Sequence, residues 1–587
     1  MRYMMRLLAI AALAVPLAAQ MTVDQRVHEF QALAGLYAKR YGPANWKIQA
    51  LGVNIFELKP WMDRVRAAKN DLDYFEICAE FVASLRDGHS RFAMQSSFSA
   101  DLGIFTDLYE GKVLVESVNR VRYPLNQFPF QVGDEVVSID GRPVETILEE
   151  LLRQRGYGTL GGARRVVADG LGFRAQSVYP RAVDLPDETA VAIRRAESGQ
   201  VETYQLTWLK SGTPIRNVPP IPSPSFAAQK KAATGTPDYM ELLNQMRNWS
   251  FDGPELAAMR DRVHIDENGE SKTREFILGW GARNPYYTPP AGFVTRRGTA
   301  AADNFFSGTF TASGKRIGLI RIPHFGPANS LAAVRELEGE VAFFKANTDG
   351  LILDITRNTG GGCVGIDYMQ RLVGREFYTF GEHLRPTLSL ISSFTNALRA
   401  AQVQRADQWV IAVFEARLNE LLESAKENRS MTGVLPACPA LVTNSYPIPS
   451  LYEQPARNAD GSVAAYDKPL IVLVDELSIS FGDIFPGMMQ DARRGPIVGM
   501  RTAGAGGSVS GWTVGTYSEG AGFVTNSLVV RAQPVKAPDL PAAPFIENVG
   551  VIPDIELNYM TRENLLTRGR PYMEAVTNIM LAEIAKN

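Results

Sequence analysis

The sequence is poor in the residues that build metal centres and disulfide frameworks. Its 587 residues include three cysteines and five histidines. An odd cysteine count allows one disulfide at most with a thiol left over, which excludes a cysteine-stapled fold. The histidines are scattered, and none stand at positions i and i+4, so no metal-ligand spacing occurs. We therefore expect neither a metal nor an organic cofactor. Cys363 follows three glycines, and its simplest interpretation is a small, buried apolar residue.

An excess of either charge is also missing. The chain has 61 basic and 63 acidic residues, for a formal net charge of −2. This balance argues against a nucleic-acid partner, and no run of like charges indicates a polyanion or a membrane surface. With 45% hydrophobic and 21% charged residues, the composition is that of a globular protein. The length allows roughly three or four domains.

Long apolar runs are absent beyond the amino terminus. Arg2 and Arg6 precede the apolar residues 7–18, which are too few for an ordinary membrane span. The small residues at 18 and 19 then resemble a signal-peptide cleavage site before Gln20. We expect residues 1–20 to be a signal peptide and the protein to be periplasmic or extracellular, with no stable membrane span after cleavage. Retention of this segment as an amino-terminal anchor is the alternative.

The rest of the chain changes character several times. Apolar residues at helical spacing predict a helical domain that ends at Asp87-Gly88. Short β-rich runs follow, then a proline-rich stretch, and then alternating strands and helices typical of an α/β core with parallel strands. The predicted divisions are a helical domain at 21–97, a β module at 98–212, a linker or poorly defined segment at 213–300, and an α/β core at 301–587 with a helical insertion at about 393–440. The insertion is either a lid or an oligomer contact.

The β module resembles a PDZ domain. Residues 132–144, with a Gly-Asp-Glu-Val-Val-Ser-Ile-Asp-Gly core, carry this likeness. The resemblance makes Leu102, Gly103, Ile104 and Phe105 a loop for the terminal carboxylate of a peptide. Consecutive backbone N–H groups can hold such a carboxylate while the peptide adds to the sheet edge. The competing interpretation is a strand start with a glycine for tight packing.

Together, four short motifs resemble the carboxyl-terminal-processing, or tail-specific, serine peptidases and the related tricorn core. They occur in the family's order, at residues 85–90, 353–362, 478–484 and 545–554. The resemblance implies a crotonase/ClpP-like α/β core with an amino-terminal helical domain and an inserted PDZ-like module. It also implies polypeptide substrates, and it covers residues 211–300 and the insertion poorly.

Ser480 is the nucleophile that this resemblance implies, with Ser478 as a competitor. Alignment through the following Asp483 favours Ser480. In this family a lysine in a later glycine-rich run activates the serine, but Ala505 stands at that place here. A serine hydroxyl needs a base to take its proton. Either another residue is the base, or the chain is inactive.

His89 is the base that the tricorn branch implies, because a histidine after Asp-Gly has that role there. Imidazole titrates near neutrality and can take and return a proton. The family likewise makes Glu547 a supporting carboxylate. The alternatives are a histidine that caps the end of a helix and an exposed glutamate.

The oxyanion donors that the family implies are backbone N–H groups. They belong to Phe481 and to Gly360 or Gly361, in the glycine run after a buried strand. The predicted protein is thus an exported serine endopeptidase that acts on extended or carboxyl-terminal segments of polypeptides by acyl transfer. The rival is a catalytically inactive, peptidase-like protein that binds peptides or apolar ligands. Esterase activity is disfavoured because no Gly-x-Ser-x-Gly elbow occurs.

Overall fold

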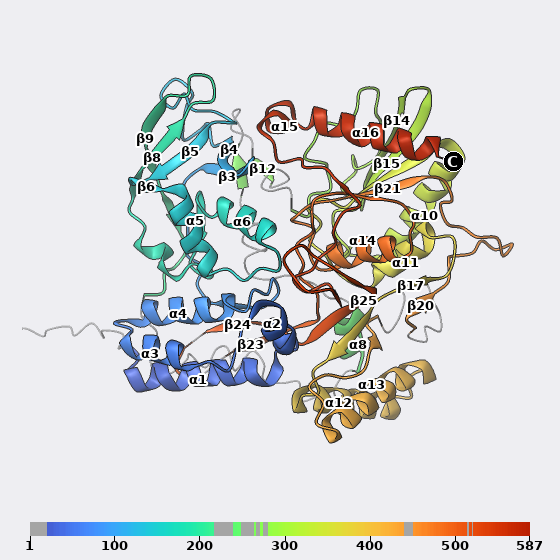
Figure 1. Ribbon diagram of the computed structural model, residues 1–587, viewed down its shortest axis with the longest axis horizontal. Helices are drawn as coiled ribbons and strands as arrows, with labels where there is room; N and C mark the ends of the chain where they lie inside the picture. Colours follow the sequence, from blue (N-terminus) through green and yellow to red (C-terminus); the bar gives the residue numbers. More distant parts are fainter. Residues whose placement is uncertain are drawn as a thin grey trace, which may run out of the picture.

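The computed structural model describes residues 20–216, 239–247, 263–265, 271–273, 280–438, 450–513, 516–518 and 520–586. Residues 1–19 of the predicted signal peptide and most of the predicted linker lie outside these residues. Within the described part of the chain, every helix is too short or too polar to cross a bilayer. Figure 1 shows the helical and PDZ-like parts on one side and the α/β core on the other.

The amino-terminal part is helical, as the apolar periodicity predicts. Its helices are α1 (Val23–Arg40), α2 (Ala44–Leu51), α3 (Lys59–Ala67) and α4 (Asp71–Ala83). Thr22 caps α1 in a capping box with Gln25, and the Asn70 side chain caps α4. A short strand after α4, β1 (Arg91–Ala93), pairs with β24 (Ala521–Thr525), which pairs with β23 (Val509–Thr513). A hairpin from the last part of the chain thus completes the helical part.

The PDZ-like module contains two sheets. The larger has the order β3-β4-β5-β8-β9, with β6 on β5, and the smaller has the order β10-β2-β7. The strands are β2 (Ser99–Asp101), β3 (Ile104–Tyr109), β4 (Lys112–Val118), β5 (Glu135–Ile139), β6 (Arg142–Pro143), β7 (Phe173–Ala175), β8 (Glu188–Arg194), β9 (Val201–Thr207) and β10 (Leu209–Ser211). The helices are α5 (Val144–Arg153), α6 (Leu160–Asp169) and the 3-10 helix η1 (Pro180–Asp184).

A seven-stranded sheet forms the α/β core, in the order β13-β14-β15-β16-β21-β22-β27. The strands are β13 (Val294–Arg297), β14 (Phe306–Ala312), β15 (Lys315–Arg321), β16 (Gly350–Asp354), β21 (Leu470–Val474), β22 (Ile497–Gly499) and β27 (Ile555–Glu556). Pairing is parallel from β15 to β27 and antiparallel from β13 to β15. The fold class predicted from the sequence is confirmed.

Both faces of this sheet are covered at its centre, which explains why β16 and β21 are buried at every position and largely apolar. One face packs on α10 (Ser330–Asn347), α11 (Val364–Leu372) and α14 (Phe481–Asp491). The other packs on α16 (Arg570–Ala585), which follows α15 (Arg562–Thr567). In β16, Leu351 and Leu353 face the first group while Ile352 faces α16.

Smaller elements complete the structure. A second sheet has the order β19-β18-β25-β26, and β17 pairs with β20 in an antiparallel, two-stranded sheet. The strands are β17 (Phe377–Tyr378), β18 (Gly381–Leu384), β19 (Leu435–Pro436), β20 (Tyr452–Glu453), β25 (Ser527–Val535) and β26 (Ala543–Phe545). The insertion is a pair of helices, α12 (Leu388–Val403) and α13 (Gln408–Lys426), against which α8 (Tyr239–Arg247) packs. The remaining described strands are β11 (Val263–Ile265) and β12 (Ser271–Thr273).

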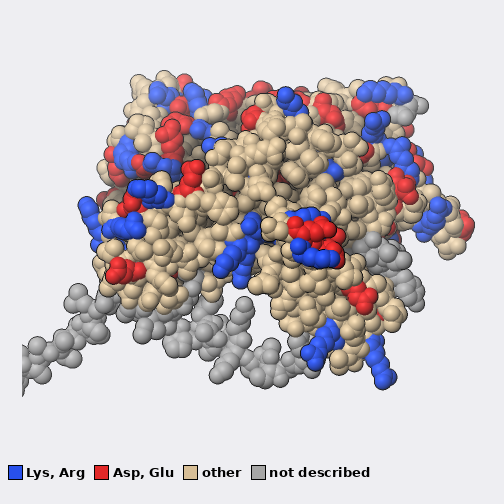
Figure 2. Space-filling view, turned by 60° about the horizontal axis from the view of Figure 1, so that its bottom comes forward, with Lys and Arg blue, Asp and Glu red and all other residues tan. Residues whose placement is uncertain are grey.

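One face of the molecule includes the helical insertion and part of the helical domain. Figure 2 shows that basic and acidic side chains on this face are interspersed among a larger uncharged surface. They form no broad patch of one sign in that view.

Candidate active site

Ser480 stands at a strained turn between a buried strand and a helix. β21 ends at Val474, and Ser480 is the amino-terminal cap of α14. The helix begins at Phe481. Ser480 has φ +61° and ψ −119°, a conformation that costs a non-glycine residue free energy. Such a sharp strand-to-helix turn holds a nucleophile at the positive end of a helix.

Asp483 holds this turn against the segment that follows β22. Its carboxylate accepts hydrogen bonds from the N–H of Ser480 at 2.9 Å and of Gly504 at 2.8 Å, and from the Thr502 hydroxyl. Burial raises the pKa of Asp483 to about 7, although these hydrogen bonds oppose the rise. Nothing in the local sequence indicates this link between the nucleophile turn and residues 502–505.

Ser478, the competing nucleophile, is fully buried and has a structural role. Its hydroxyl donates to the carbonyl of Ile355 at 2.9 Å and lies 3.1 Å from Asp475 Oδ1. These bonds fix the loop between β21 and Ser480.

The glycine run after β16 lies directly against Ser480. Gly360 has φ +81°, and a Cβ there would lie 2.6 Å from Ser480 Cβ and 3.0 Å from the nitrogen of Phe481. Only glycine permits this approach. The Gly360 N–H donates to Asn358 Oδ1 at 2.8 Å, whereas Gly361 forms a parallel bridge with Phe325. The structure thus brings together the predicted oxyanion residues, with the Gly360 N–H engaged inside the chain.

The side chain of Phe481, which departs from the small residue of the family motif, is directed into the core. Its ring lies 5.1 Å from that of Phe325 and 5.5 Å from that of Phe380, measured between centroids, and is fully buried. The larger side chain therefore fills the core and leaves the backbone of the turn in place.

Ala505 is fully buried, and the Asp87-Gly88-His89 loop packs against it. A Cβ on Gly88 would lie 2.8 Å from Ala505 Cβ and 3.8 Å from Ile479 Cδ1. The place where the family motif has its lysine is thus in contact with the loop that carries His89. Ile479, the residue before Ser480, belongs to the same contact.

His89 is buried beside a carboxylate. Asp87 Oδ1 accepts hydrogen bonds from the N–H groups of His89 at 2.8 Å and Ser90 at 2.9 Å, and from Thr525 Oγ1 at 3.1 Å. Burial lowers the pKa of His89 to about 4, although the charge of Asp87 opposes the change. Burial alone would raise the pKa of Asp87, but Lys47 and His89 bring it below the usual value. The imidazole is therefore neutral at pH 7, the form that can accept a proton.

Glu547 is fully buried and paired with a lysine. Lys47 Nζ forms an ion pair with Glu547 and donates to Asn548 Oδ1 at 2.6 Å and to the carbonyl of Arg86 at 2.8 Å. Burial and the nearby Asp87 raise the pKa of Glu547, and the ammonium of Lys47 opposes this rise by favouring the ionised carboxylate. Within the described part of the chain, Glu547 thus contacts the His89 loop through Lys47 of α2. The lone Lys47 in an amphipathic helix gave no sequence signal for this role.

The segment before α6 covers the site from the PDZ-like side. A Cβ on Gly158 would lie 2.0 Å from the carbonyl oxygen of Gly504, so the two backbones touch. A half-open pocket lies between these segments, and its empty space of about 400 Å³ includes its open mouth. It is lined by Gly88, Arg155, Gly156, Tyr157, Gly158, Thr159, Gly162, Ala163, Val166, Trp280, Glu476, Leu477, Ile479, Ala503 and Ala505.

Residues 102–105, the predicted carboxylate loop, do not line this pocket, and two of the loop's N–H groups are engaged within the chain. Leu102 donates to the carbonyl of Gly172 at 2.8 Å, and Gly103 donates to Asp101 Oδ1 at 2.7 Å. Ile104 and Phe105 are buried. The loop in this structure is therefore packed rather than an open carboxylate nest.

The neighbouring strand β3 is linked to the core through α6. Arg165 of α6 pairs with Asp107 of β3 at 2.9 Å and with Asp475, before the nucleophile turn, at 3.2 Å. All of these side chains are buried. The ion pairs join the PDZ-like module to the loop that precedes Ser480.

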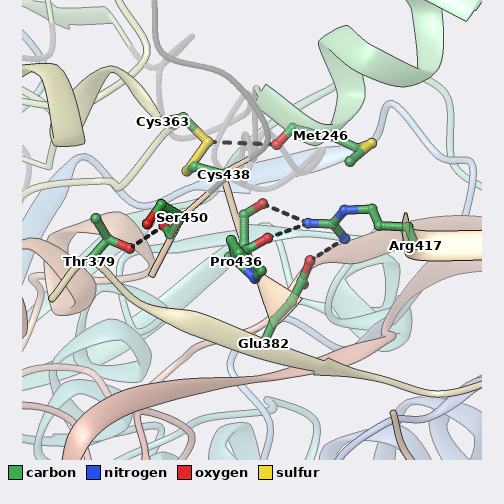
Figure 3. The surroundings of a disulfide bond; sticks show 9 residues. Met246, Cys363, Thr379, Glu382, Arg417, Pro436, Cys438 and Ser450 are labelled. Carbon is green, nitrogen blue, oxygen red and sulfur yellow. Dashed lines mark hydrogen bonds and ion pairs between the residues drawn. A yellow bond between two sulfur atoms is a disulfide. The ribbon is translucent and has the colours of Figure 1, made fainter. Parts of the chain in front are cut away.

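Cys363 is disulfide-bonded to Cys438, which corrects its interpretation as a simple buried apolar residue. The sequence allowed one disulfide without giving the pair, and Cys78 is the buried free thiol. Figure 3 shows the disulfide beside the Met246 carbonyl, with Arg417 bridging Glu382 and the carbonyl of Pro436. The bond joins the end of the glycine run to the segment that follows the helical insertion.

Comparison with protein families agrees with this geometry. Residues 316–557 match peptidase family S41, and residues 99–216 match a PDZ domain. The S41 match spans most of the α/β core. The chain is a serine peptidase, and the resemblance stated from the four motifs is confirmed. Polypeptide substrates follow from the family.

The sequences of known relatives are similar to this chain at low identity, and some of the matches extend over nearly the whole chain. A Chlamydia pneumoniae protein is 23% identical over 97% of this chain and 91% of its own length. The chloroplastic C-terminal processing peptidase of Tetradesmus obliquus is 33% identical over 20% of this chain and 22% of its own length. The crystal structure of mature CPAF superposes with a TM-score of 0.71 at 20% identity, covering 96% of this chain and 98% of that one. This last likeness shows a shared fold.

Proposed function

We propose that this chain is an exported endopeptidase in which Ser480 is the nucleophile and His89 is the general base. One observation carries the proposal: the Asp87-Gly88-His89 loop packs on Ala505 and Ile479. That contact brings the histidine-bearing loop to the place of the family's missing lysine and beside the nucleophile turn. Burial that keeps His89 neutral supports its role as a proton acceptor.

In the proposed reaction, the Ser480 oxygen attacks the scissile carbonyl carbon while His89 takes the hydroxyl proton. The resulting oxyanion accepts hydrogen bonds from the Phe481 and Gly361 N–H groups, since the Gly360 N–H is already donated to Asn358. His89 then protonates the leaving amine, and the C–N bond breaks. Water, deprotonated by His89, hydrolyses the acyl-enzyme and restores Ser480.

Glu547 is a positioning residue in this scheme. Its pairing with Lys47 fixes an ammonium that donates to the Arg86 carbonyl, three residues before His89. Asn548 Nδ2 donates to the same carbonyl at 2.8 Å. These contacts fix the loop backbone, and the neighbouring Asp87 supplies the negative charge that favours imidazolium during the reaction.

Export is supported by chemistry as well as by the amino-terminal motif. Disulfides persist in oxidising compartments, and Cys363 and Cys438 form one here. The substrates that we propose are extended or carboxyl-terminal segments of polypeptides, the class that the family resemblance implies.

A fluorophosphonate probe tests the nucleophile and the base together. We expect the wild-type chain to be labelled, and Ser480→Ala and His89→Ala to lose labelling. The matched control is His28→Ala, because His28 is exposed on α1 and its loss should leave labelling unchanged. Labelling that survives both site changes would contradict the assignment of Ser480 and His89. A folded wild-type chain that neither reacts nor cleaves unfolded polypeptides would favour the inactive binding protein instead.

A further inference from the structure

The half-open pocket between the PDZ-like module and the core adjoins both proposed catalytic residues. Its lining includes Gly88, which precedes His89, and Ile479, which precedes Ser480. Ala505, at the place of the family's lysine, lines the pocket as well. The pocket therefore lies beside the place where the scissile bond of a bound polypeptide would be held.

Most of the pocket wall is apolar. Two small buried clusters line it, and the half-buried Trp280 packs against both. The clusters consist of Ile479, Ala503 and Ala505 in one case and of Val166 and Leu477 in the other. The indole N–H of Trp280 donates to the carbonyl of Leu477 at 2.6 Å. Because this bond satisfies the polar atom of the ring, Trp280 contributes an apolar surface to the pocket.

Helix α6 and the segment before it form the wall on the PDZ-like side. A Cβ on Gly162 would lie 2.5 Å from the carbonyl oxygen of Glu476, and one on Gly156 would lie 2.4 Å from that of Asp87. Glycine allows the backbones of the two modules to approach this closely. Ala163, the residue after Gly162, also lines the pocket and is buried. Small residues of the PDZ-like module thus bound the space beside the nucleophile turn.

The two charged side chains on the wall have opposite signs. They are Arg155 and Glu476, and Glu476 also pairs with Arg165 at 3.1 Å. A charged substrate side chain would lose its water in this pocket, which costs free energy unless the charge is paired. An apolar side chain instead gains about 25 cal/mol for each Å² of surface that it buries. The lining therefore favours an apolar occupant.

We propose that this pocket binds an apolar side chain of the polypeptide substrate, on one of the two residues that flank the scissile bond. Trp280 and Ala163 set the size of the pocket. The inference rests on the proposed function, because it needs a peptide held at Ser480. Since α6 belongs to the PDZ-like module, this module would take part directly in the choice of the cut site.

A map of cut sites is the first test of the pocket. The wild-type chain digests a reduced and alkylated polypeptide of known sequence, and mass spectrometry identifies the new termini. We expect Leu, Ile, Val, Met or Phe at one of the two flanking positions more often than their abundance in that polypeptide. Cut sites without such an enrichment at either flanking position would overturn the proposal.

Two peptides that differ only at the enriched position then measure the pocket. One peptide has Leu there and the other has Ala, and the preference is the ratio of their kcat/KM values. A methylene in an apolar pocket changes kcat/KM by about 10-fold or more, so we expect a wild-type ratio of at least about 10. Ala163→Leu fills the pocket and Trp280→Ala removes part of its wall, so each should bring the ratio below about 3. Ala32→Leu, at an exposed position of α1, is the control and should keep the wild-type ratio.

The ratio separates a role in specificity from a merely structural role. A variant that only loses folded protein cleaves both peptides more slowly by the same factor, and its ratio stays at the wild-type value. Trp280→Ala changes a half-buried position, so it provides the result if Ala163→Leu does not fold. A wild-type ratio that persists in Trp280→Ala and in any folded Ala163→Leu chain would overturn the proposal.

Fluorophosphonate labelling distinguishes a failure of this inference from a failure of the proposed function. A wild-type chain that is labelled and cleaves polypeptides, but shows no apolar preference, would overturn the role of the pocket alone. A folded wild-type chain that is neither labelled nor active would overturn the proposed function, and the role of the pocket with it.

Discussion

Lys47 Nζ forms an ion pair with the Glu547 carboxylate, and neither side chain is exposed to solvent. The two residues are 500 positions apart in the sequence. The ion pair therefore joins helix α2 to the end of the α/β core at the place where the His89 loop turns.

Removing the lysine should destabilise the protein strongly. Lys47→Met leaves Glu547 buried without its counter-charge, and the loss of one partner from a buried pair costs about 3–5 kcal/mol. The free energy of unfolding from urea titration measures the effect. Lys59→Met is the control, because Lys59 lies on an exposed surface pair and should change stability by less than about 1 kcal/mol. Equal effects of the two changes would show that Glu547 does not depend on Lys47.

The protonation of His89 should make stability fall in acid. An unfolded histidine titrates near 6.5, whereas burial lowers the pKa of His89 to about 4. Between these values the unfolded chain binds a proton that the folded chain does not, so stability falls as the pH falls, by about 3 kcal/mol in total. Urea unfolding at several pH values should show this loss in the wild type and in His28→Asn, but not in His89→Asn. A pH profile that His89→Asn leaves unchanged would contradict it.

Restoring the family lysine should not restore a lysine mechanism. Ala505 is fully buried against Gly88, so Ala505→Lys would force an ammonium and extra volume into the contact that positions His89. Overpacking alone costs about 1–3 kcal/mol, and we expect lower stability and loss of probe labelling. Gln533→Lys, at an exposed position of β25, should be neutral. An Ala505→Lys variant that is labelled normally when His89 is also replaced would refute this prediction.

Gly360→Ala tests the contact between the glycine run and the nucleophile. The added Cβ would lie 2.6 Å from Ser480 Cβ at a backbone φ of +81°, so the turn must move. That movement would displace the Phe481 N–H, a proposed oxyanion donor, since the added Cβ would also lie 3.0 Å from its nitrogen. Loss of such a donor costs about 10²–10³ in kcat, and we expect a loss of that size for the proposed peptidase activity. Gly339→Ala, in the exposed face of α10 with open space around it, should instead keep activity and add up to about 1 kcal/mol of stability. Equal activity of both variants would show that Gly360 is not critical.

The disulfide should contribute measurably to stability. Cys363 and Cys438 are separated by 75 positions, and a cross-link over such a loop adds about 4 kcal/mol in the chain-entropy description. Reductant should therefore lower the melting temperature of the wild type and leave Cys363→Ser/Cys438→Ser unchanged. If reductant affects both equally, the effect would have to come from elsewhere in the chain.

The sequence predicted the features that depend on local pattern or on family motifs. Apolar periodicity indicated α1, α4 and α10, and the Gly-Asp-Glu-Val run indicated the PDZ-like sheet. The sequence did not predict the contacts between residues that are far apart in the chain. Nothing local shows that Asp483 holds the segment at Ala505, or that Lys47 of α2 pairs with Glu547, since such partners are chosen by the tertiary fold.

The helical insertion shows the same limit. Residues 388–426 form two helices joined by a short turn rather than one long helix, and Arg405, with φ +53°, lies in that turn. Non-glycine residues rarely adopt this conformation. The break between the two helices therefore lacks the glycine or proline that usually indicates one in a sequence. The pairing of Cys363 with Cys438 likewise depends on where the insertion returns to the core.

The two ends of the helical insertion lie side by side, which allows the length of the insertion to vary. The insertion leaves the core after β18 and re-enters it at β19, which pairs with β18. Cys438, which follows β19, is disulfide-bonded to Cys363. The two ends of the insertion are thus clamped together, so the helices between them could be shortened, lengthened or exchanged as a cassette without altering the spacing of the glycines beside Ser480. Diversification of this family member would be least costly there.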